Sequence, residues 1–216
     1  MGNGKDLIFD IGASRGYKSK MFLDLGFRVI AVEPIKRNIK FMQKKFQNYG
    51  RKIKIIRAGV SNKVSFEKLR VCASESFSTF SDEQVKMFKE SKDTENLEWF
   101  KEEKVRMITL EYLISRYGLP KFIKIDVEGN VLKVLEGLSK RVDLISFEYN
   151  SLNMGPAISC IQRISSLGDY KFNISRGEST KFTYNGWLGK KEILRRIRLI
   201  KRKPMQYGDI YAKKAN

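Results

Sequence analysis

Four residues near the start of the chain, Asp10, Gly12, Ser14 and Gly16, follow the spacing D-x-G-x-S-x-G within "LIFDIGASRG". Gly12 allows the chain to turn where a side chain would clash, and Gly16 allows a helix or a ligand to approach closely. An apolar run that ends in this way indicates a strand followed by a helix, with either a structural turn or a nucleotide pocket between them. The turn alone fits NAD, FAD and other nucleotides.

A second acid narrows the choice of ligand. Glu33 ends the next apolar run, "RVIAVE", 21 residues after Gly12. A carboxylate at this distance can accept hydrogen bonds from both hydroxyls of a ribose; the alternative is a surface acid in front of Pro34. Because the carboxylate of Asp10 would repel a diphosphate, the pattern favours S-adenosylmethionine, a nucleoside that carries a sulfonium and an ammonium group but no phosphate.

Acids further along the chain are candidates for proton transfer. The chain has no histidine, so a general base must be a carboxylate, a lysine or a tyrosine. Asp126 in "KIDVEG" is the first candidate, and Glu128 and Glu148 are further ones. Asp126 and Glu148 end neighbouring predicted strands, so they could instead hold a divalent cation with Asn150 or serve as structural supports. We assign no residue to a metal.

These residues need elements that place them at one edge of a sheet. Apolar runs predict strands over 7–12, 28–33, 52–60, 122–128, 143–149, 170–175 and 208–214. Amphipathic segments predict helices between them: Ile35, Ile39, Met42 and Phe46 recur at helical spacing, and Thr109 is a plausible N-cap. Alternating strands and helices predict an α/β fold with a mostly parallel sheet, whose ligands bind at the carboxyl ends of the strands.

One polar segment interrupts this alternation. Residues 74–104 contain Phe77, Phe80, Phe88, Trp99 and Phe100 and form too long a stretch for an ordinary connection. We expect a helical, lid-like insertion over the carboxyl edge of the sheet, within a single domain that spans residues 1–216. The alternative is a set of peripheral helices packed by those aromatic rings.

The net charge of +19 is concentrated in two segments. Residues 36–57 hold nine basic residues and no acid, and residues 189–203 hold eight basic residues and one acid. Such segments suit an anionic partner, either an acidic glycan, RNA or a membrane surface; the alternative is a solvated face. No apolar run is long enough to cross a bilayer and the start of the chain has no secretory signal, so we expect a cytoplasmic protein.

The chain resembles the FkbM-type class I S-adenosylmethionine-dependent methyltransferases. The likeness is carried by "FDIGASRGYKSKMFLDLGFRVIAVEP", "IIRAGVSN", "VRMITLEYLISRYG" and "FIKIDVEGNVLKVLEGL", with "KIDVEG" the most specific piece. The resemblance implies a Rossmann-like, seven-stranded sheet with helices on both faces and an antiparallel last strand. Residues 170–175 and 208–214 would form its final two strands.

The resemblance also implies roles for individual residues. The cofactor loop would contain Asp10, Gly12 and Gly16, with Ser14 in place of a glycine often found there. Glu33 would bind the ribose, Gly59 and Val60 would lie beside the adenine, and Asp126 would lie near the reacting methyl group, followed by Glu128 and Gly129.

The function that this resemblance implies is O-methylation of a hydroxyl on a sugar, glycan or small molecule. Two alternatives remain open on the sequence. One is methylation of RNA ribose with help from the basic segments. The other is a non-catalytic protein that keeps the fold and binds anionic surfaces.

Overall fold

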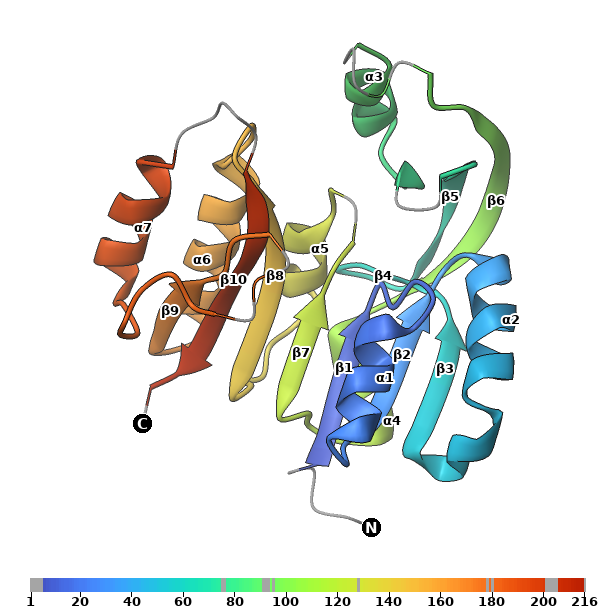
Figure 1. Cartoon of the computed structure of the whole chain (residues 1–216), viewed down its shortest axis with the longest axis horizontal. Coiled ribbons are helices and arrows are strands. Elements are labelled where there is room, and N and C mark those ends of the chain that lie inside the picture. Colours follow the sequence, from blue (N-terminus) through green and yellow to red (C-terminus); the bar gives the residue numbers. More distant parts are fainter. Residues whose placement is uncertain are drawn as a thin grey trace.

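The computed structural model describes residues 6–74, 77–90, 94, 96–127, 129–177, 179, 181–200 and 206–215. Within these residues, seven strands form one sheet in the order β3-β2-β1-β7-β8-β10-β9 (Figure 1). The strands are β1 (Leu7–Ile11), β2 (Arg28–Glu33), β3 (Ile53–Arg57), β7 (Phe122–Ile125), β8 (Leu144–Asn150), β9 (Tyr170–Ile174) and β10 (Tyr207–Lys214). Strand β10 runs antiparallel to both β8 and β9, and the other pairs are parallel. The predicted α/β fold with an antiparallel last strand is confirmed.

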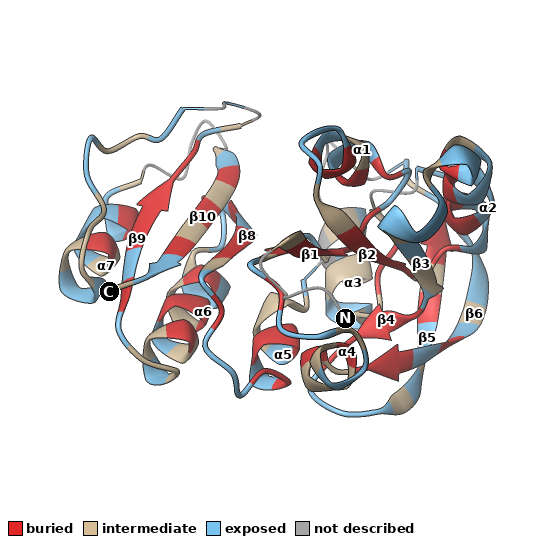
Figure 2. Ribbon diagram, turned by 90° about the horizontal axis from the view of Figure 1, so that it is seen from below, coloured by how far each residue is buried: buried red, intermediate tan, exposed pale blue. Residues whose placement is uncertain are grey.

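Helices cover both faces of this sheet (Figure 2). One face carries α1 (Tyr17–Asp24) and α2 (Lys36–Lys45), and η2 (Gln47–Lys52) leads from α2 into β3. The other face carries α4 (Leu110–Tyr117), α5 (Val131–Glu136), α6 (Gly155–Ser166) and α7 (Lys190–Arg198). Helix α6 was not predicted from the sequence. The expected N-cap of α4 is present, since Thr109 Oγ1 accepts a hydrogen bond of 3.0 Å from the Tyr112 amide.

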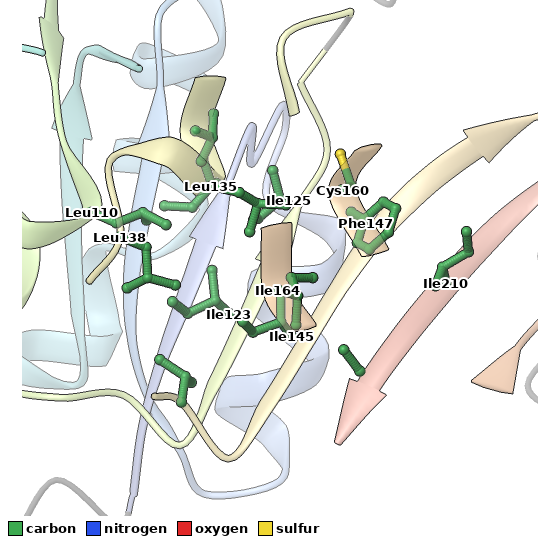
Figure 3. Packing of buried hydrophobic residues seen from close by; sticks show 14 of the residues in the cluster. Leu110, Ile123, Ile125, Leu135, Leu138, Ile145, Phe147, Cys160, Ile164 and Ile210 are labelled. Atoms are coloured by element: carbon green, nitrogen blue, oxygen red, sulfur yellow. The ribbon is translucent and has the colours of Figure 1, made fainter. Parts of the chain in front are cut away.

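The larger core lies on the α4–α7 face. Alternate residues of the central strands point to it, so Ile123, Ile125, Ile145 and Phe147 are fully buried. Figure 3 shows these side chains against Leu135, Leu138, Cys160 and Ile164 of the covering helices and the loop after α5. On the opposite face, a smaller cluster joins Phe22 and Leu23 of α1 to Met42 of α2 over β1 and β2. Strands β1 and β2 therefore contribute residues to a packed core on each face of the sheet, and this holds their carboxyl ends in place.

The predicted strand 52–60 is two separate strands. Strand β3 ends at Arg57, and β4 (Gly59–Val60) leaves the main sheet to pair in parallel with β6 (Trp99–Ile108). Strand β6 also pairs antiparallel with β5 (Ser65–Cys72), which completes a second sheet in the order β4-β6-β5. The predicted strand 122–128 is also shorter and ends at Ile125. The pairing of β5 with β6 joins residues far apart in sequence, which local patterns do not reveal.

The segment from β5 to β6 forms an excursion on the carboxyl side of the main sheet (Figure 1). Helix α3 (Asp82–Glu90) lies between the two strands. The Phe88 ring stacks on Trp99 with centroids 6.1 Å apart, and Trp99 Nε1 donates to the Phe77 carbonyl at 3.0 Å. Phe80 instead packs against the buried Leu69. Some aromatic side chains of the 74–104 segment thus hold the excursion together, while Phe80 packs against a cluster that includes Ile35, the residue before α2.

In the part of the chain that the structure describes, no helix combines the length and the apolar character that crossing a bilayer requires.

Candidate functional site

A pocket lies at the carboxyl edge of the main sheet, between the turn after β1, the end of β2, strand β4, the excursion and the end of β7. Its lining consists of Ile11, Gly12, Ser14, Val32, Glu33, Pro34, Ile35, Asn38, Ala58, Gly59, Val60, Leu69, Ser78, Thr79, Phe80, Asp126, Val127 and Asn130. The structure therefore brings six of the predicted site residues together in one cavity: Gly12, Ser14, Glu33, Gly59, Val60 and Asp126.

Gly12 fixes the turn that forms the floor of this pocket. Its φ is +77°, a conformation that favours glycine. A Cβ atom at this position would lie 1.7 Å from the Asp126 carbonyl oxygen, so no side chain fits between the two strands. The amides of Gly12 and Ala13 both donate to the Val32 carbonyl, at 2.9 and 3.0 Å. The turn is thus clamped between the ends of β2 and β7.

Glu33 connects this turn to helix α2. Its carboxylate accepts hydrogen bonds from the Ser14 amide at 2.9 Å, the Ile35 amide at 2.9 Å and Asn38 Nδ2 at 3.2 Å. The side chain is buried but lines the pocket. Ser14 has a φ of +49°, which is unusual for a residue other than glycine. The hydrogen bond from its amide to Glu33 supports that conformation, so the loop and the carboxylate fix each other.

The pocket lining also has an apolar part, of which the sequence analysis predicted only Val60. Ile35, Val60, Leu69 and Phe80 all line the cavity, and Phe80 packs against a cluster that includes Ile35 and Leu69. This wall can accept the face of a flat ring.

Asn38 is a further polar group of the pocket lining. It is buried, and its Oδ1 atom has no hydrogen-bond partner among the described residues. A buried acceptor without a partner is costly, so this atom suits a donor on a bound molecule. The sequence analysis did not predict Asn38 as a site residue. The signal that the sequence offers for it is its position five residues after Glu33.

A buried lysine lies beneath the pocket. Lys124 Nζ forms an ion pair of 2.8 Å with Asp126 Oδ2, and their side chains are 8% and 44% exposed. Asp10 is the direct neighbour of Lys124 in the β1–β7 register. Burial lowers the pKa of Lys124, but the carboxylates of Asp10 and Asp126 outweigh this effect and raise it above its ordinary value. Lys124 is therefore a cation that holds the Asp126 carboxylate in a fixed position at the pocket.

Asp10 is not among the residues that line the pocket, and its contact with the cofactor stays a prediction. Its side chain is fully buried, and Oδ2 accepts a hydrogen bond of 2.5 Å from Ser19 Oγ of α1. Its Oδ1 atom has no hydrogen-bond partner among the described residues. Burial raises the pKa of Asp10, and Lys124 opposes that shift. In the structure, the Asp10 carboxylate acts electrostatically on Lys124.

Two further predicted residues, Gly16 and Glu148, lie outside the pocket lining. Gly16, with a φ of +71°, is outside the pocket lining, and a Cβ atom there would lie 2.6 Å from the Phe46 ring. Glu148 is exposed on β8, opposite Asp209 of β10, and is also outside the lining. Glu128 falls outside the described residues. Among the residues that are described, no group of three or more His, Cys, Asp or Glu side chains is placed to hold a metal ion.

Comparisons with known proteins identify the family and the fold of the chain. The sequence model of the methyltransferase FkbM domain matches residues 10–199. No curated protein is a significant match to the sequence. The solved METTL16 MTase domain resembles the chain with a TM-score of 0.52 at 10% identity, over 98% of this chain and 61% of that one. At this identity the likeness to METTL16 shows a shared fold alone.

A second solved structure is precorrin-6y C5,15-methyltransferase from Geobacter metallireducens GS-15. It has a TM-score of 0.48 at 11% identity, over 99% of this chain and 83% of that one.

The contact between Gly12 and Asp126 predicts a strong effect of Gly12→Ala on folding. The matched control is Gly26→Ala, because Gly26 also has a positive φ, +88°, but has open space where its Cβ would be. In the control, the free energy of unfolding should fall by roughly 1–2 kcal/mol, the cost of placing a Cβ atom at a positive φ. In Gly12→Ala the free energy of unfolding should fall by about 3 kcal/mol or more, because the backbone atoms of Asp126 must also move. Urea denaturation measures both, and equal losses would contradict the clamp.

The buried charges predict a second effect. Lys124→Met leaves Asp10 buried without its cation, which should cost about 3–5 kcal/mol of unfolding free energy. Adding Asp10→Asn removes the uncompensated charge, so the double variant should be more stable than Lys124→Met alone. Lys121→Met, at an exposed position just before β7, should change stability by less than about 0.5 kcal/mol. A double variant no more stable than Lys124→Met would show that Asp10 and Lys124 are not coupled.

Proposed function

The chain belongs to the FkbM methyltransferase family, and from that premise we propose that its pocket binds S-adenosylmethionine for O-methylation of a hydroxyl on a sugar, glycan or small molecule. The observation that carries the proposal is the half-exposed carboxylate of Asp126, which lines the pocket and is held from below by Lys124. A carboxylate fixed in this way suits a hydroxyl acceptor, which must lose a proton during the reaction.

The donor groups of the pocket fit a nucleoside without phosphates. Glu33 and Asn38 would bind the ribose hydroxyls, since one is a carboxylate and the other has a buried oxygen without a partner. Val60 and Phe80 would enclose the adenine from two sides. The turn at Gly12 would support the methionine portion. Among the described residues that line the pocket, none is a lysine or an arginine that could pair with a diphosphate.

The reaction needs alignment and one proton acceptor. When bound, S-adenosylmethionine supplies a methyl group on a positively charged sulfur. Asp126 would accept a hydrogen bond from the acceptor hydroxyl, orient its oxygen, and take its proton as the new bond forms. Lys124 keeps the Asp126 carboxylate in place through their 2.8 Å ion pair. Because the chain has no histidine, the general base must be another group, and the Asp126 carboxylate would serve as that base.

The two other predicted acids have a weaker basis in this proposal. Glu148 lies on the sheet face that carries Lys124, since Lys124 pairs with Ser146 two residues earlier on β8. We propose that it contacts the far end of an acceptor rather than the reacting hydroxyl. Glu128 follows Asp126 by two residues and stays a sequence-based candidate.

A second candidate is methylation of RNA ribose. It is favoured by the exposed Lys36 and Arg37, which directly precede Asn38 of the pocket lining. Both functions use the same site and differ in the acceptor. Binding of RNA should weaken steeply as salt increases, because phosphate contacts release counterions; binding of a neutral sugar should not.

Incubation with methyl-labelled S-adenosylmethionine and separate polysaccharide, glycolipid, small-sugar and RNA fractions tests the proposal. Label should enter a hydroxyl-bearing sugar or glycan fraction in an alkali-stable ether linkage. Label in RNA alone would favour the second candidate. Binding of the cofactor without transfer to any fraction would favour a non-catalytic protein.

The ribose contact can be isolated with Glu33→Ala. Loss of charge-assisted hydrogen bonds of about 1.5–3 kcal/mol each should weaken the binding of S-adenosylhomocysteine tenfold or more in calorimetry. Glu33 also anchors the Ser14 amide, so a second ligand is needed: the analogue without the two ribose hydroxyls. Wild type should bind this analogue more weakly than the parent, whereas the variant should not distinguish them. Discrimination retained by the variant would remove Glu33 as the ribose ligand. Glu67→Ala, at a half-buried position on β5 outside the pocket lining, serves as the control.

The proton acceptor can be tested with Asp126→Asn. Asparagine keeps the size of the side chain and can still accept a hydrogen bond from Lys124, so cofactor affinity should stay close to wild type. Turnover should fall by roughly 10²–10⁴-fold, the usual contribution of a general base. Asp169→Asn, at an exposed position before β9, should leave both quantities unchanged. Wild-type turnover in Asp126→Asn would exclude Asp126 as the base.

A further inference from the structure

Helix α1 exposes a row of apolar side chains. Tyr17, Met21 and Leu25 follow one another at intervals of four residues, and their exposed fractions are 66%, 46% and 67%. Residues four apart lie on the same side of a helix. Phe41 of α2 is also exposed, at 44%. We call these four residues the α1–α2 patch.

A lysine joins the two helices at this patch. Lys45 Nζ lies 4.3 Å from the centroid of the Tyr17 ring and 5.8 Å from that of Phe41. The Arg15 guanidinium also lies over Phe41, at 5.8 Å. Helices α1 and α2 are on the same face of the sheet (Figure 2). The apolar side chains therefore form a continuous strip with cations set into it.

The surroundings of the strip are strongly basic. Residues 11–57 contain thirteen lysines and arginines but only two acids, Asp24 and Glu33. Glu33 is buried in the pocket, and Asp24 is paired with Lys20 at 2.7 Å. Lys18 beside Tyr17, and Lys40 and Lys44 beside Phe41, are exposed. Within residues 11–57 the basic residues therefore outnumber the acids by eleven.

We infer that the α1–α2 patch docks on the surface of a membrane that contains anionic phospholipids. An apolar row flanked by basic residues matches the boundary between headgroups and acyl chains, where the row is buried and each cation contacts lipid phosphates. Such a row is unusual on a free surface, where exposed apolar residues are normally scattered. A nucleic acid would use the cations and the two rings, but Met21 and Leu25 have no flat face on which a base could stack.

The location of the patch links docking to the pocket. Helix α1 begins at Tyr17, directly after the turn that contributes Gly12 and Ser14 to the pocket lining. Docking would therefore hold the site beside the lipid surface. The inference concerns the surface itself and does not depend on which acceptor is methylated.

Co-sedimentation of the full chain with vesicles tests the inference. Phosphatidylcholine vesicles that contain phosphatidylserine should bind the protein at least tenfold more tightly than vesicles of phosphatidylcholine alone. The triple variant Tyr17→Ser, Met21→Ser, Leu25→Ser should lose at least tenfold of that affinity. The charge variant Lys18→Glu, Lys44→Glu should lose a similar factor, and added salt should weaken the wild type further.

Matched controls come from the opposite end of the molecule. Leu199→Ser removes an equally exposed apolar residue, and Lys191→Glu with Arg198→Glu reverses charges on α7, the second basic segment. Both should bind vesicles like wild type. Unchanged thermal unfolding would show that the patch variants are folded, as expected for exposed positions.

Two results would overturn the inference. One is equal binding of wild type and the triple serine variant to phosphatidylserine vesicles. The other is binding of a single-stranded RNA oligonucleotide that is lost in the charge variant, without measurable binding to vesicles, which would assign the patch to nucleic acid. Failure of methyl transfer would leave either vesicle result unaffected, so the two proposals fail separately.

Discussion

The close approach of Gly12 to the backbone of Asp126 is the constraint on which the site depends. Strand β1 lies between β2 and β7, so the turn after it can set both neighbours at once. The amide of Gly12 holds the end of β2 through the Val32 carbonyl, and its missing side chain admits the Asp126 carbonyl. The residues that carry the two carboxylates, Glu33 and Asp126, each follow a residue or belong to a strand end that this turn contacts. The turn after β1 therefore fixes the backbone on both sides of the pocket.

Beneath that turn, buried charges connect stability to the site. Asp10 lies in the middle of the sheet, where an unpaired carboxylate would be strongly unfavourable, and Lys124 on the adjacent strand compensates it. The same ammonium reaches Asp126 at the pocket. A protein that needed only a stable sheet would be better served by apolar residues at these positions. In the proposed function, this ion network has the role of holding the Asp126 carboxylate in a fixed position at the pocket.

The strands of the main sheet and the position of the pocket could be predicted from the sequence, because they depend on residues that are close together in the chain. Apolar runs located the seven strands of the main sheet, and the glycine turn with Glu33 located the pocket, because turn chemistry and strand ends depend on neighbouring residues. Pairing across long separations was missed: β5 with β6, and β4 with β6 in place of an extended β3. The position of Asp10 in the motif does not reveal which way its side chain faces, so its complete burial could not be predicted. Lys124 could have been found as a single charge within the apolar run "FIKI".

The excursion is the part of the site that is least tied to the main core. Phe80 is held by a small cluster with Leu69, Val71 and Val105, to which the main fold contributes only Ile35. A second contact joins the excursion to the end of β7, where a Cβ atom on Gly129 would lie 2.6 Å from Gln84 of α3. A ligand between Phe80 and Ile35 adds a third contact, and a molecule that binds only the assembled pocket stabilises it by mass action. Binding in the pocket should therefore stabilise the packing of Phe80 against Ile35.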